Sequence, residues 1–400
     1  MQITYKFRLY PNSEKEKKLL WTLEKCREVY NQMLEELKKQ EIPNRLELQS
    51  MLPKLKEKCP ELKEVYPKVL QHEVYRLFSN LRALAQLKRN GKRVGRLRFK
   101  GKGWFKTFTY NQSGFELRKT GKRLDWLWFS KIGDIPIRVH REIEGNIKQI
   151  VIKRCNSGKW WGCVSVESEN EPEQKPIQKA VGLDVGLEHF TTDSDGKQIE
   201  NPHHLKKTQK RLKRRQKKLS RKEKNSENRN KQRMRVASLH ERVTNRRDDF
   251  LHKLSRYYVN RYDLIAVEDL NIRGMLRNHK LSSSISDVAW SKFAEMLTYK
   301  AENAGKLVVR VNPRNTTHRC SRCGRIVKKS LAVRIHRCPY CGLELDRDYN
   351  SAIDILKLGL EKIPQGLQEF TPVEIGPLRE LETIPASLIV EAGSHLPKIR

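Results

Sequence analysis

The chain has 400 residues, and its 83 Lys or Arg residues outnumber its 47 Asp or Glu residues, which gives a formal net charge of +36. Hydrophobic residues make up 37% of the chain, which excludes global disorder, and the length suggests two or three domains. No apolar run reaches the roughly 18–20 residues of a membrane span, and the first residues lack the apolar core of a secretory signal. Because positive charge extends over nearly the whole chain, the partner that it favours is nucleic acid. We therefore expect a cytosolic protein that is not associated with a membrane.

The first part of the chain alternates between strand and helix patterns. Residues 2–9 alternate like a strand, and Ser13-x-x-Glu16 has the spacing of a capping box that begins a helix. A second helical pattern of apolar residues runs from Val69 to Leu87. We therefore predict a helical domain over residues 12–90. Residues 91–178 are rich in glycine, aromatic residues and short alternating runs, which predict a β-barrel or sandwich that includes residues 1–11.

The next part of the chain predicts a mixed α/β domain. Its strand patterns are VGLDVG at residues 181–186, DLIAVEDL at 263–270 and the run 306–311, with a helical pattern over 289–304. We assign residues 179–314 and 343–358 to this domain.

Within the α/β domain, residues 203–261 predict an intensely basic arm of two antiparallel helices. Residues 205–261 contain 22 Lys or Arg and only 5 Asp or Glu. Leu205, Leu212 and Leu219 recur every seven residues and predict one apolar seam between the two helices. Lys213 and Arg214 are two of the basic residues on the predicted outer faces of these helices. We expect these faces to contact the nucleic-acid backbone.

Two pairs of cysteines have the spacing of zinc-ribbon knuckles. Cys320 and Cys323 form one pair, Cys338 and Cys341 form the other, and fourteen residues separate the pairs. Two residues between thiols allow both sulfurs to contact one tetrahedral ion, and a reducing cytosol disfavours disulfides. Residues 315–342 therefore predict a ribbon with one Zn²⁺. Because four thiolates leave no open position for water, this zinc is expected to be structural.

Three acids are candidates for a catalytic metal site. Asp184 lies inside a strand pattern, Glu268 lies at the end of another, and Asp348 begins a helical pattern in LDRDYN. Each has a simpler interpretation: Asp184 could make a turn, Glu268 could pair with a cation, and Asp348 could cap the helix. Together they predict a centre in which two ions about 3.5–4 Å apart promote phosphodiester hydrolysis. Asp346 competes with Asp348 for the third place.

Residues 359–400 differ in composition from the rest of the chain. This segment contains five prolines and has six Glu against four Lys or Arg. Such a composition predicts a disordered or loosely attached tail.

At this point the motifs resemble a known family. The segments that carry the resemblance are VGLDVGLEHFTTDSDGKQIENP, VEDLNIRGM, SSSISDVAWSKFAEMLTYKAENAG, and the four-cysteine block that continues into LDRDYNSAIDIL. They resemble TnpB, the RNA-guided nuclease encoded by insertion sequences and related to type V CRISPR effectors. RLYPNSEKEKKL and GKRVGRLRFKG extend the resemblance over roughly residues 1–358.

The resemblance implies a multidomain α+β protein. Its parts are a helical recognition bundle, a β-barrel wedge domain, and a RuvC-like, RNase H-type nuclease domain with an inserted zinc ribbon. The resemblance places the catalytic acids, and two Mg²⁺ ions, at Asp184, Glu268 and Asp348. It implies a monomer that binds a transposon-derived guide RNA, called ωRNA or reRNA, and double-stranded target DNA beside a short target-adjacent motif. By similarity, Gln71 and Thr109 lie where TnpB approaches that motif.

The leading hypothesis is therefore an RNA-guided DNA endonuclease. A DNA transposase with an RNase H fold would use the same three acids for strand transfer. A non-cleaving RNA-guided DNA binder is disfavoured because all three acids are present. A zinc-ribbon RNA-binding protein would explain the cysteines and the charge, but it would leave the acids without a role.

Overall fold

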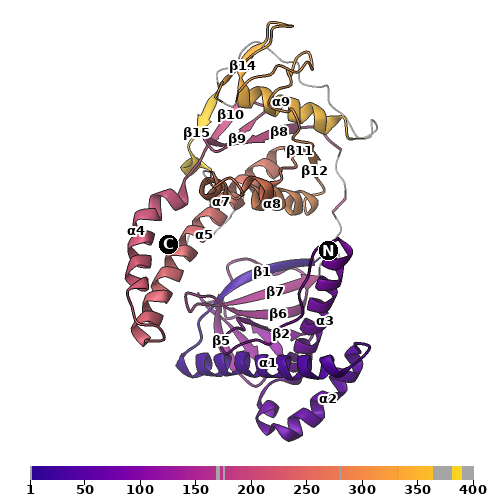
Figure 1. Ribbon diagram of the computed structural model, residues 1–400, viewed down its shortest axis with the longest axis vertical. Coiled ribbons are helices and arrows are strands. Elements are labelled where there is room, and N and C mark those ends of the chain that lie inside the picture. Colours follow the sequence, from indigo (N-terminus) through magenta and orange to yellow (C-terminus); the bar gives the residue numbers. More distant parts are fainter. Residues whose placement is uncertain are drawn as a thin grey trace. The chain divides into compact units, whose positions relative to one another are not determined.

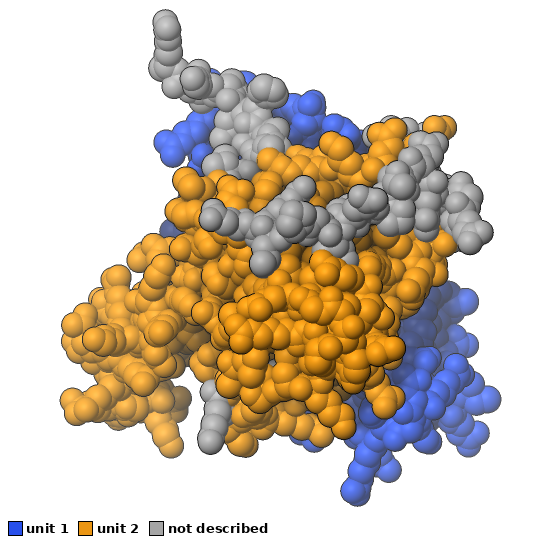
Figure 2. All heavy atoms as spheres, turned by 90° about the horizontal axis from the view of Figure 1, so that it is seen from above, with its two compact units in different colours: residues 1–170 blue, residues 171–400 orange. Residues whose placement is uncertain are grey.

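The computed structural model describes residues 2–167, 172–173, 176–279, 281–330, 332–363 and 381–389. The chain forms two compact units, residues 1–170 and residues 171–400 (Figures 1 and 2). Each unit is described separately below. In the described part of the chain, no helix combines the length and apolar character needed to cross a membrane.

The first unit combines helices with a seven-stranded sheet. Its elements are β1 (Gln2–Leu9), α1 (Ser13–Lys39), α2 (Arg45–Lys58), the 3-10 helix η1 (Pro60–Glu64), α3 (Pro67–Arg89), β2 (Thr107–Asn111), β3 (Phe115–Arg118), β4 (Asp125–Phe129), β5 (Gly133–Arg138), β6 (Asn146–Arg154) and β7 (Trp160–Glu167). The strand order is β2-β6-β7-β1-β5-β4-β3 with antiparallel pairs. The strand predicted at residues 2–9 thus lies in the middle of this sheet.

The sheet of the first unit is strongly curled. Tyr110 of β2 packs on Phe129 of β4 with ring centroids 4.9 Å apart, although β2 is an end strand of the sheet. In the described residues β2 and β3 are the end strands of this sheet, and the assignment of a β-barrel or sandwich stays a prediction. In the connection between β2 and β3, Gln112 and Gly114 have positive φ values of 63° and 82°.

The helices of the first unit follow the predicted pattern with two corrections. Helix α1 begins at Ser13, but its cap is Asn12, whose side chain accepts a hydrogen bond from the Lys15 backbone N–H at 2.8 Å. The predicted Ser13 capping box is therefore wrong by one residue. Helix α2 was not predicted, because Pro53 inside it interrupts the pattern and its buried face is short.

The second unit contains a six-stranded mixed sheet and the four-cysteine ribbon. Its elements are β8 (Ala180–Val185), β9 (His189–Asp193), β10 (Lys197–Glu200), α4 (His204–Ser220), α5 (Glu227–Arg261), β11 (Leu264–Glu268), α6 (Ile272–Met275), α7 (Ser282–Val288), α8 (Trp290–Glu302), β12 (Leu307–Val311), β13 (Ile335–Arg337), β14 (Glu344–Asp346), α9 (Arg347–Leu360), β15 (Glu382–Ile384) and the 3-10 helix η3 (Ala386–Leu388). The strand order is β12-β11-β8-β9-β10-β15, and the first three strands are parallel.

The two faces of this sheet carry different residues of β8 and β11. Val181, Leu183, Ile265 and Val267 belong to the core that contains α5 and α8. The alternate residues Ala180, Leu264 and Ala266 pack with residues of α9. Helix α9 therefore covers one face, and α5 with α8 cover the other (Figure 1). Because side chains alternate along a strand, Asp184 and Glu268 belong to the α9 face.

The basic arm consists of α4 and α5, which pack side by side (Figure 1). Leu212, Val236 and Leu239 form their shared apolar seam, as predicted. At the base of the arm, Asp287 of α7 accepts hydrogen bonds from the Leu205 backbone N–H and from the Arg247 side chain, both at 2.9 Å. This carboxylate joins the start of α4 to α5 and α7.

The prediction of a disordered tail over residues 359–400 is wrong for its described residues. Leu360 ends α9, and β15 pairs in parallel with β10. Ile389 is buried in the core that contains α5 and α8. Composition did not indicate this order, because the strand depends on pairing with an existing sheet edge. Leu381, Ile384 and Ile389 also pack against apolar clusters of the second unit. Residues 364–380 and 390–400 lie outside the described residues.

Candidate active site and metal centre

The first two candidate acids lie near the carboxyl ends of two neighbouring parallel strands. Val267 of β11 pairs with Leu183 of β8, so Glu268 and Asp184 are the next residues of the two strands. Asp184 also lies opposite Thr192 of β9, and its backbone oxygen accepts a hydrogen bond from the Thr191 hydroxyl at 2.8 Å. This pairing fixes both acids at the same edge of the sheet.

Helix α9 brings the third acid to the same place, and two glycines permit its close packing. A Cβ on Gly182 would lie 2.1 Å from the backbone oxygen of Ala352, and a Cβ on Gly359 would lie 2.5 Å from the Cβ of Ala266. Both positions therefore require the absence of a side chain. The first turn of this tightly packed helix carries Asp348.

The structure separates the roles of Asp346 and Asp348. Asp346 is the cap of α9, and its Oδ1 accepts hydrogen bonds from the backbone N–H groups of Asp348 at 2.9 Å and Tyr349 at 3.0 Å. The capping role considered for Asp348 thus belongs to Asp346. The side chain of Asp348 is 17% exposed and instead contacts arginines.

Electrostatic interactions connect the three predicted acids. Burial raises the pKa of the Asp184 carboxyl well above its usual range, and the negative charges of Glu268 and Asp348 raise it further. Burial also raises the pKa of Glu268, whereas the hydrogen bond from the Thr316 hydroxyl lowers it. A divalent cation would offset this concentration of negative charge. Three carboxylates are also oxygen donors of the kind that Mg²⁺ prefers.

Two arginines contact Asp348. Arg347 donates to its Oδ1 through Nε at 2.8 Å, and the Nη2 atom of Arg347 lies 2.7 Å from the same oxygen. Arg334 Nη1 lies 3.7 Å from Asp348 Oδ2, and Arg334 also forms an ion pair with Glu188. These contacts orient the third carboxylate.

Sequence reasoning missed Arg334, Arg347 and Thr316 as neighbours of the acids. Arg347 stands between two acids in the triplet DRD, which is a local signal. Thr316 and Arg334 carry no such signal, because they reach the acids only through the fold.

The four predicted cysteines converge. The ligand atoms of Cys320, Cys323, Cys338 and Cys341 all lie within 4.8 Å of one another, and the sulfurs of Cys320 and Cys341, and of Cys323 and Cys338, are 3.6 Å apart. These spacings fit four thiolates about 2.3 Å from one tetrahedral zinc ion. The four residues could therefore hold a metal ion. Within the described ranges, the four cysteines form the only group of His, Cys, Asp or Glu residues whose ligand atoms lie this close together. The ligand atoms of the three acids are therefore farther apart.

Matching glycines shape the two knuckles. Gly324 and Gly342 have φ values of 73° and 70°, a conformation that favours glycine. Their backbone N–H groups donate to the backbone oxygens of Cys320 at 2.9 Å and Cys338 at 3.0 Å. These paired turns direct all four thiols inward.

The other predicted contact residues lie in different environments. Gln71 is exposed near the start of α3, whereas Thr109 is buried in β2 with 2% of its surface exposed. Lys213 and Arg214 are exposed on α4. Thr109 therefore presents no free side chain in this arrangement of the first unit.

Comparisons with known proteins agree with this architecture. Residues 163–279 match the OrfB_IS605 family, described as "Probable transposase", and residues 290–355 match the "Cas12f1-like, TNB domain". Residues 1–40 match a "Helix-turn-helix domain" of OrfB_IS605 proteins. The solved Cas12f1–sgRNA–target DNA complex contains a chain that matches 89% of this chain and is itself covered to 98%, with a TM-score of 0.56 and 14% identity. The fold is thus of the Cas12f1 class.

Curated relatives identify the family. A protein of Streptomyces pristinaespiralis named "Putative RNA-guided DNA endonuclease" is 32% identical over 369 residues, which cover 89% of both chains. "Putative RNA-guided DNA endonuclease InsQ" of Escherichia coli (strain K12) is 30% identical over 284 residues, which cover 67% of this chain and 69% of InsQ. The chain belongs to the TnpB family, also called OrfB_IS605.

Proposed function

We propose that this chain is an RNA-guided DNA endonuclease that hydrolyses phosphodiester bonds in DNA selected by a transposon-derived guide RNA. The observation that carries the proposal is the arrangement of Asp184, Glu268 and Asp348. Two paired strand ends and one closely packed helix collect these carboxylates, in a chain of the TnpB family. The names of the relatives in Streptomyces pristinaespiralis and Escherichia coli support the same activity.

Asp184, Glu268 and Asp348 are the residues that would hold two Mg²⁺ ions. When bound, such ions activate a water nucleophile and stabilise the leaving oxygen. Asp184 must be ionised to act as a ligand, which its neighbours oppose in the absence of a cation. Thr316 holds Glu268 by a hydrogen bond, and Arg347 holds Asp348. These chain residues therefore orient the acids, and the acids bear the charge that attracts the metal.

The remaining assignments follow from the family and from the charge of the chain. Residues 1–11 with 91–178 would form the wedge domain, and residues 12–90 the recognition domain. The α/β sheet with its arm would form the RuvC-like nuclease domain. Cys320, Cys323, Cys338 and Cys341 would hold one structural Zn²⁺. Exposed cations such as Lys213 and Arg214 would contact the backbones of guide RNA and target DNA.

A DNA transposase is the second candidate, because residues 163–279 match a family described as "Probable transposase". The two activities differ in their products. A nuclease releases ends formed by hydrolysis, whereas a transposase joins the end of a DNA element to the target.

The deciding experiment starts from the protein purified with its RNA. The RNA is sequenced, and DNA that matches its variable segment is supplied together with Mg²⁺ and a labelled element end. We expect a discrete copurifying RNA and cut target without joined product. Joining of the element end, or cutting that does not require the RNA, would contradict the proposal.

A further inference from the structure

The side chain of Asn350 holds the backbone on both sides of one ribbon cysteine. Asn350 lies in α9 and is fully buried. Its Oδ1 accepts a hydrogen bond from the Ser321 backbone N–H at 3.0 Å, and its Nδ2 donates to the Arg319 backbone oxygen at 2.8 Å. Cys320 stands between these two residues. One amide side chain therefore attaches the first cysteine knuckle to the helix whose first turn carries Asp348.

Two more residues of α9 contact the same knuckle. Asp354 and Lys357 follow Asn350 by four and seven residues, which places all three on one side of the helix. The Nζ atom of Lys357 donates to the Ser321 backbone oxygen, and Asp354 Oδ2 lies 3.9 Å from Arg319 Nε. The opposite side of α9 packs on β8 and β11. The helix is thus held between the sheet and the ribbon.

The chain that leads into this knuckle also holds Glu268. Thr316 is 1% exposed, and its hydroxyl donates to a carboxylate oxygen of Glu268. The backbone N–H of Arg319 donates to the backbone oxygen of Asn315 at 2.8 Å, which closes a turn around Thr316. The segment 315–321 therefore contacts one acid at its beginning and α9 at its end.

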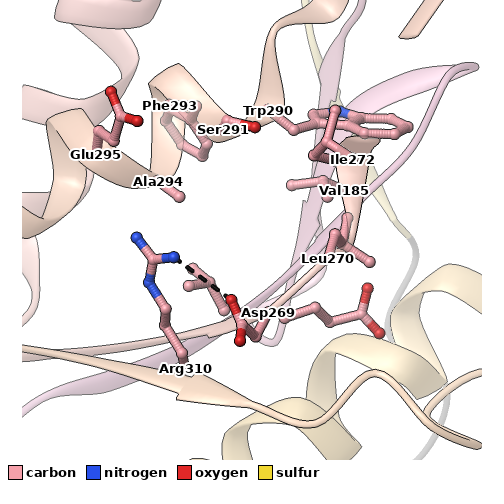
Figure 3. Close-up of a pocket in the computed structure, with 12 residues that line it drawn as sticks. Val185, Asp269, Leu270, Ile272, Trp290, Ser291, Phe293, Ala294, Glu295 and Arg310 are labelled. Atoms are coloured by element: carbon pink, nitrogen blue, oxygen red, sulfur yellow. Dashed lines mark hydrogen bonds and ion pairs between the residues drawn. The ribbon is translucent and has the colours of Figure 1, made fainter. Parts of the chain in front are cut away.

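Among the described residues, Thr316 is the only side chain that hydrogen-bonds Glu268. Glu268 also lines a small pocket with residues of β8, α8 and β12. The ion pair in this pocket joins Arg310 to Asp269, the residue after Glu268 (Figure 3). This ion pair uses the neighbouring acid and leaves Glu268 to Thr316. The orientation of the Glu268 carboxylate therefore depends on the segment that carries Thr316.

We infer that Asn350 is a positioning residue that couples the ribbon to the acid site. It holds the knuckle against α9, and so fixes the segment that supports Glu268 relative to the helix that carries Asp348. Cys320, when bound to zinc, would hold the same knuckle from its other side. The inference rests on the proposed nuclease function, and it adds a role for the ribbon in the geometry of the acids.

The test removes both hydrogen bonds of Asn350 with little change in volume. Asn350→Leu keeps a side chain of similar size that can neither donate nor accept. Lost outer-shell contacts lower metal affinity by roughly 10–100-fold, so the variant should release zinc to a chelator roughly tenfold faster than wild type. In the complex with guide RNA and matched DNA, it should also need severalfold more Mg²⁺ for half-maximal cleavage. Both properties are measured below the melting temperature of the variant, so that a loss of stability alone changes neither.

Ser351→Ala is the matched control. Ser351 is buried in the same turn of α9, and its hydroxyl donates to the Arg347 backbone oxygen at 3.1 Å. This hydrogen bond lies within the helix and does not involve the ribbon. Ser351→Ala should therefore keep the zinc release and the Mg²⁺ requirement of the wild type.

A second variant serves if Asn350→Leu does not fold. Lys357→Met removes the hydrogen bond to Ser321 from a partly exposed position and keeps the apolar part of the side chain. It should change zinc release and the Mg²⁺ requirement in the same direction as Asn350→Leu, by a smaller factor.

The two proposals fail in different ways. If the wild-type complex cuts guide-matched DNA but the folded variants match it in both properties, the inference is wrong and the nuclease function stands. A change in only one of the two properties, the same changes in Ser351→Ala, or a wild-type protein without zinc would also contradict the inference. If the wild-type complex cuts no matched DNA, both proposals are wrong.

Discussion

Asp184 and Glu268 each follow a paired residue of two adjacent parallel strands, Leu183 of β8 and Val267 of β11. Parallel strands end at the same edge of a sheet, so the pairing of the apolar residues determines where the acids meet. The packing of α9 on that sheet then brings Asp348 to within electrostatic reach of Asp184.

The first prediction distinguishes the two acids of the DRD triplet. Asp184→Asn, Glu268→Gln and Asp348→Asn should each lower guided cleavage by at least about a hundredfold, because each removes a charge from the metal site. Target binding by the complex should remain. Asp346→Asn should cut within about tenfold of wild type, because Asn also caps helices well. Cleavage rates and gel-shift binding measure both properties. A normal Asp348→Asn variant beside an inactive Asp346→Asn variant would reverse the assignment.

The second prediction concerns the contact of Gly182 with α9. Gly182→Ala places a methyl group 2.1 Å from the Ala352 oxygen, so the helix must move. We expect the free energy of unfolding to fall by about 1–3 kcal/mol and cleavage to fall with it, because Asp348 moves with α9. Gly95→Ala is the matched control, since its added Cβ would meet nothing within 4 Å. Denaturant unfolding and cleavage rates are measured for both variants. If Gly182→Ala has the same stability and activity as Gly95→Ala, Gly182 has no such packing role.

The zinc ribbon gives a third prediction. Cys320→Ser should lower both the melting temperature and cleavage, because a closed four-thiolate site contributes folding energy directly. Metal analysis of the wild type should find about one zinc ion per chain. Cys155→Ser, which changes a cysteine outside the ribbon, should behave like wild type. Absence of zinc in a folded protein with freely reactive ribbon thiols would contradict the assignment.

The fourth prediction is a pH dependence of stability that originates in the first unit. Glu73 is fully buried in α3, 3.1 Å from Arg76, and burial raises its pKa to about 8, although Arg76 opposes the shift. The folded chain therefore keeps a proton that the unfolded chain loses. The protonated Glu73 carboxyl therefore contributes to stability below the usual glutamate pKa. This contribution is lost as the pH rises towards 8.

Glu73→Gln imitates the protonated acid and should flatten this dependence. Denaturant unfolding at several pH values between about 5 and 8 measures it. Glu57→Gln, at an exposed position on α2, should retain the wild-type slope. Identical slopes for Glu73→Gln and wild type would show that Glu73 is already ionised in the folded chain.

Much of the candidate site could be predicted because its signals are local. The strands that carry Asp184 and Glu268 are short apolar runs, and the two cysteine pairs have a diagnostic spacing. In contrast, the sequence alone could not decide whether Asp346 or Asp348 caps α9, because both are aspartates at the predicted helix start. Only the backbone geometry assigns the cap to Asp346.

Other features depend on contacts between distant segments. β15 is three residues long, and it is a strand because β10 offers a free edge. Thr316 and Arg334 reach Glu268 and Asp348 across the fold. The pocket beside Glu268 combines residues of β8, β11, α8 and β12, which no single sequence pattern could bring together.

The most direct test of the central claim is a guide exchange. Two complexes are prepared with guides that differ only in their pairing segments, and each is offered both matching DNA targets with the same flanking motif. We predict that each complex cuts only its matched target, that mismatches beside the flanking motif are tolerated least, and that Asp184→Asn abolishes all cutting. A cleavage pattern that stays the same after the guides are exchanged would show that the protein itself selects the DNA, and would contradict the account.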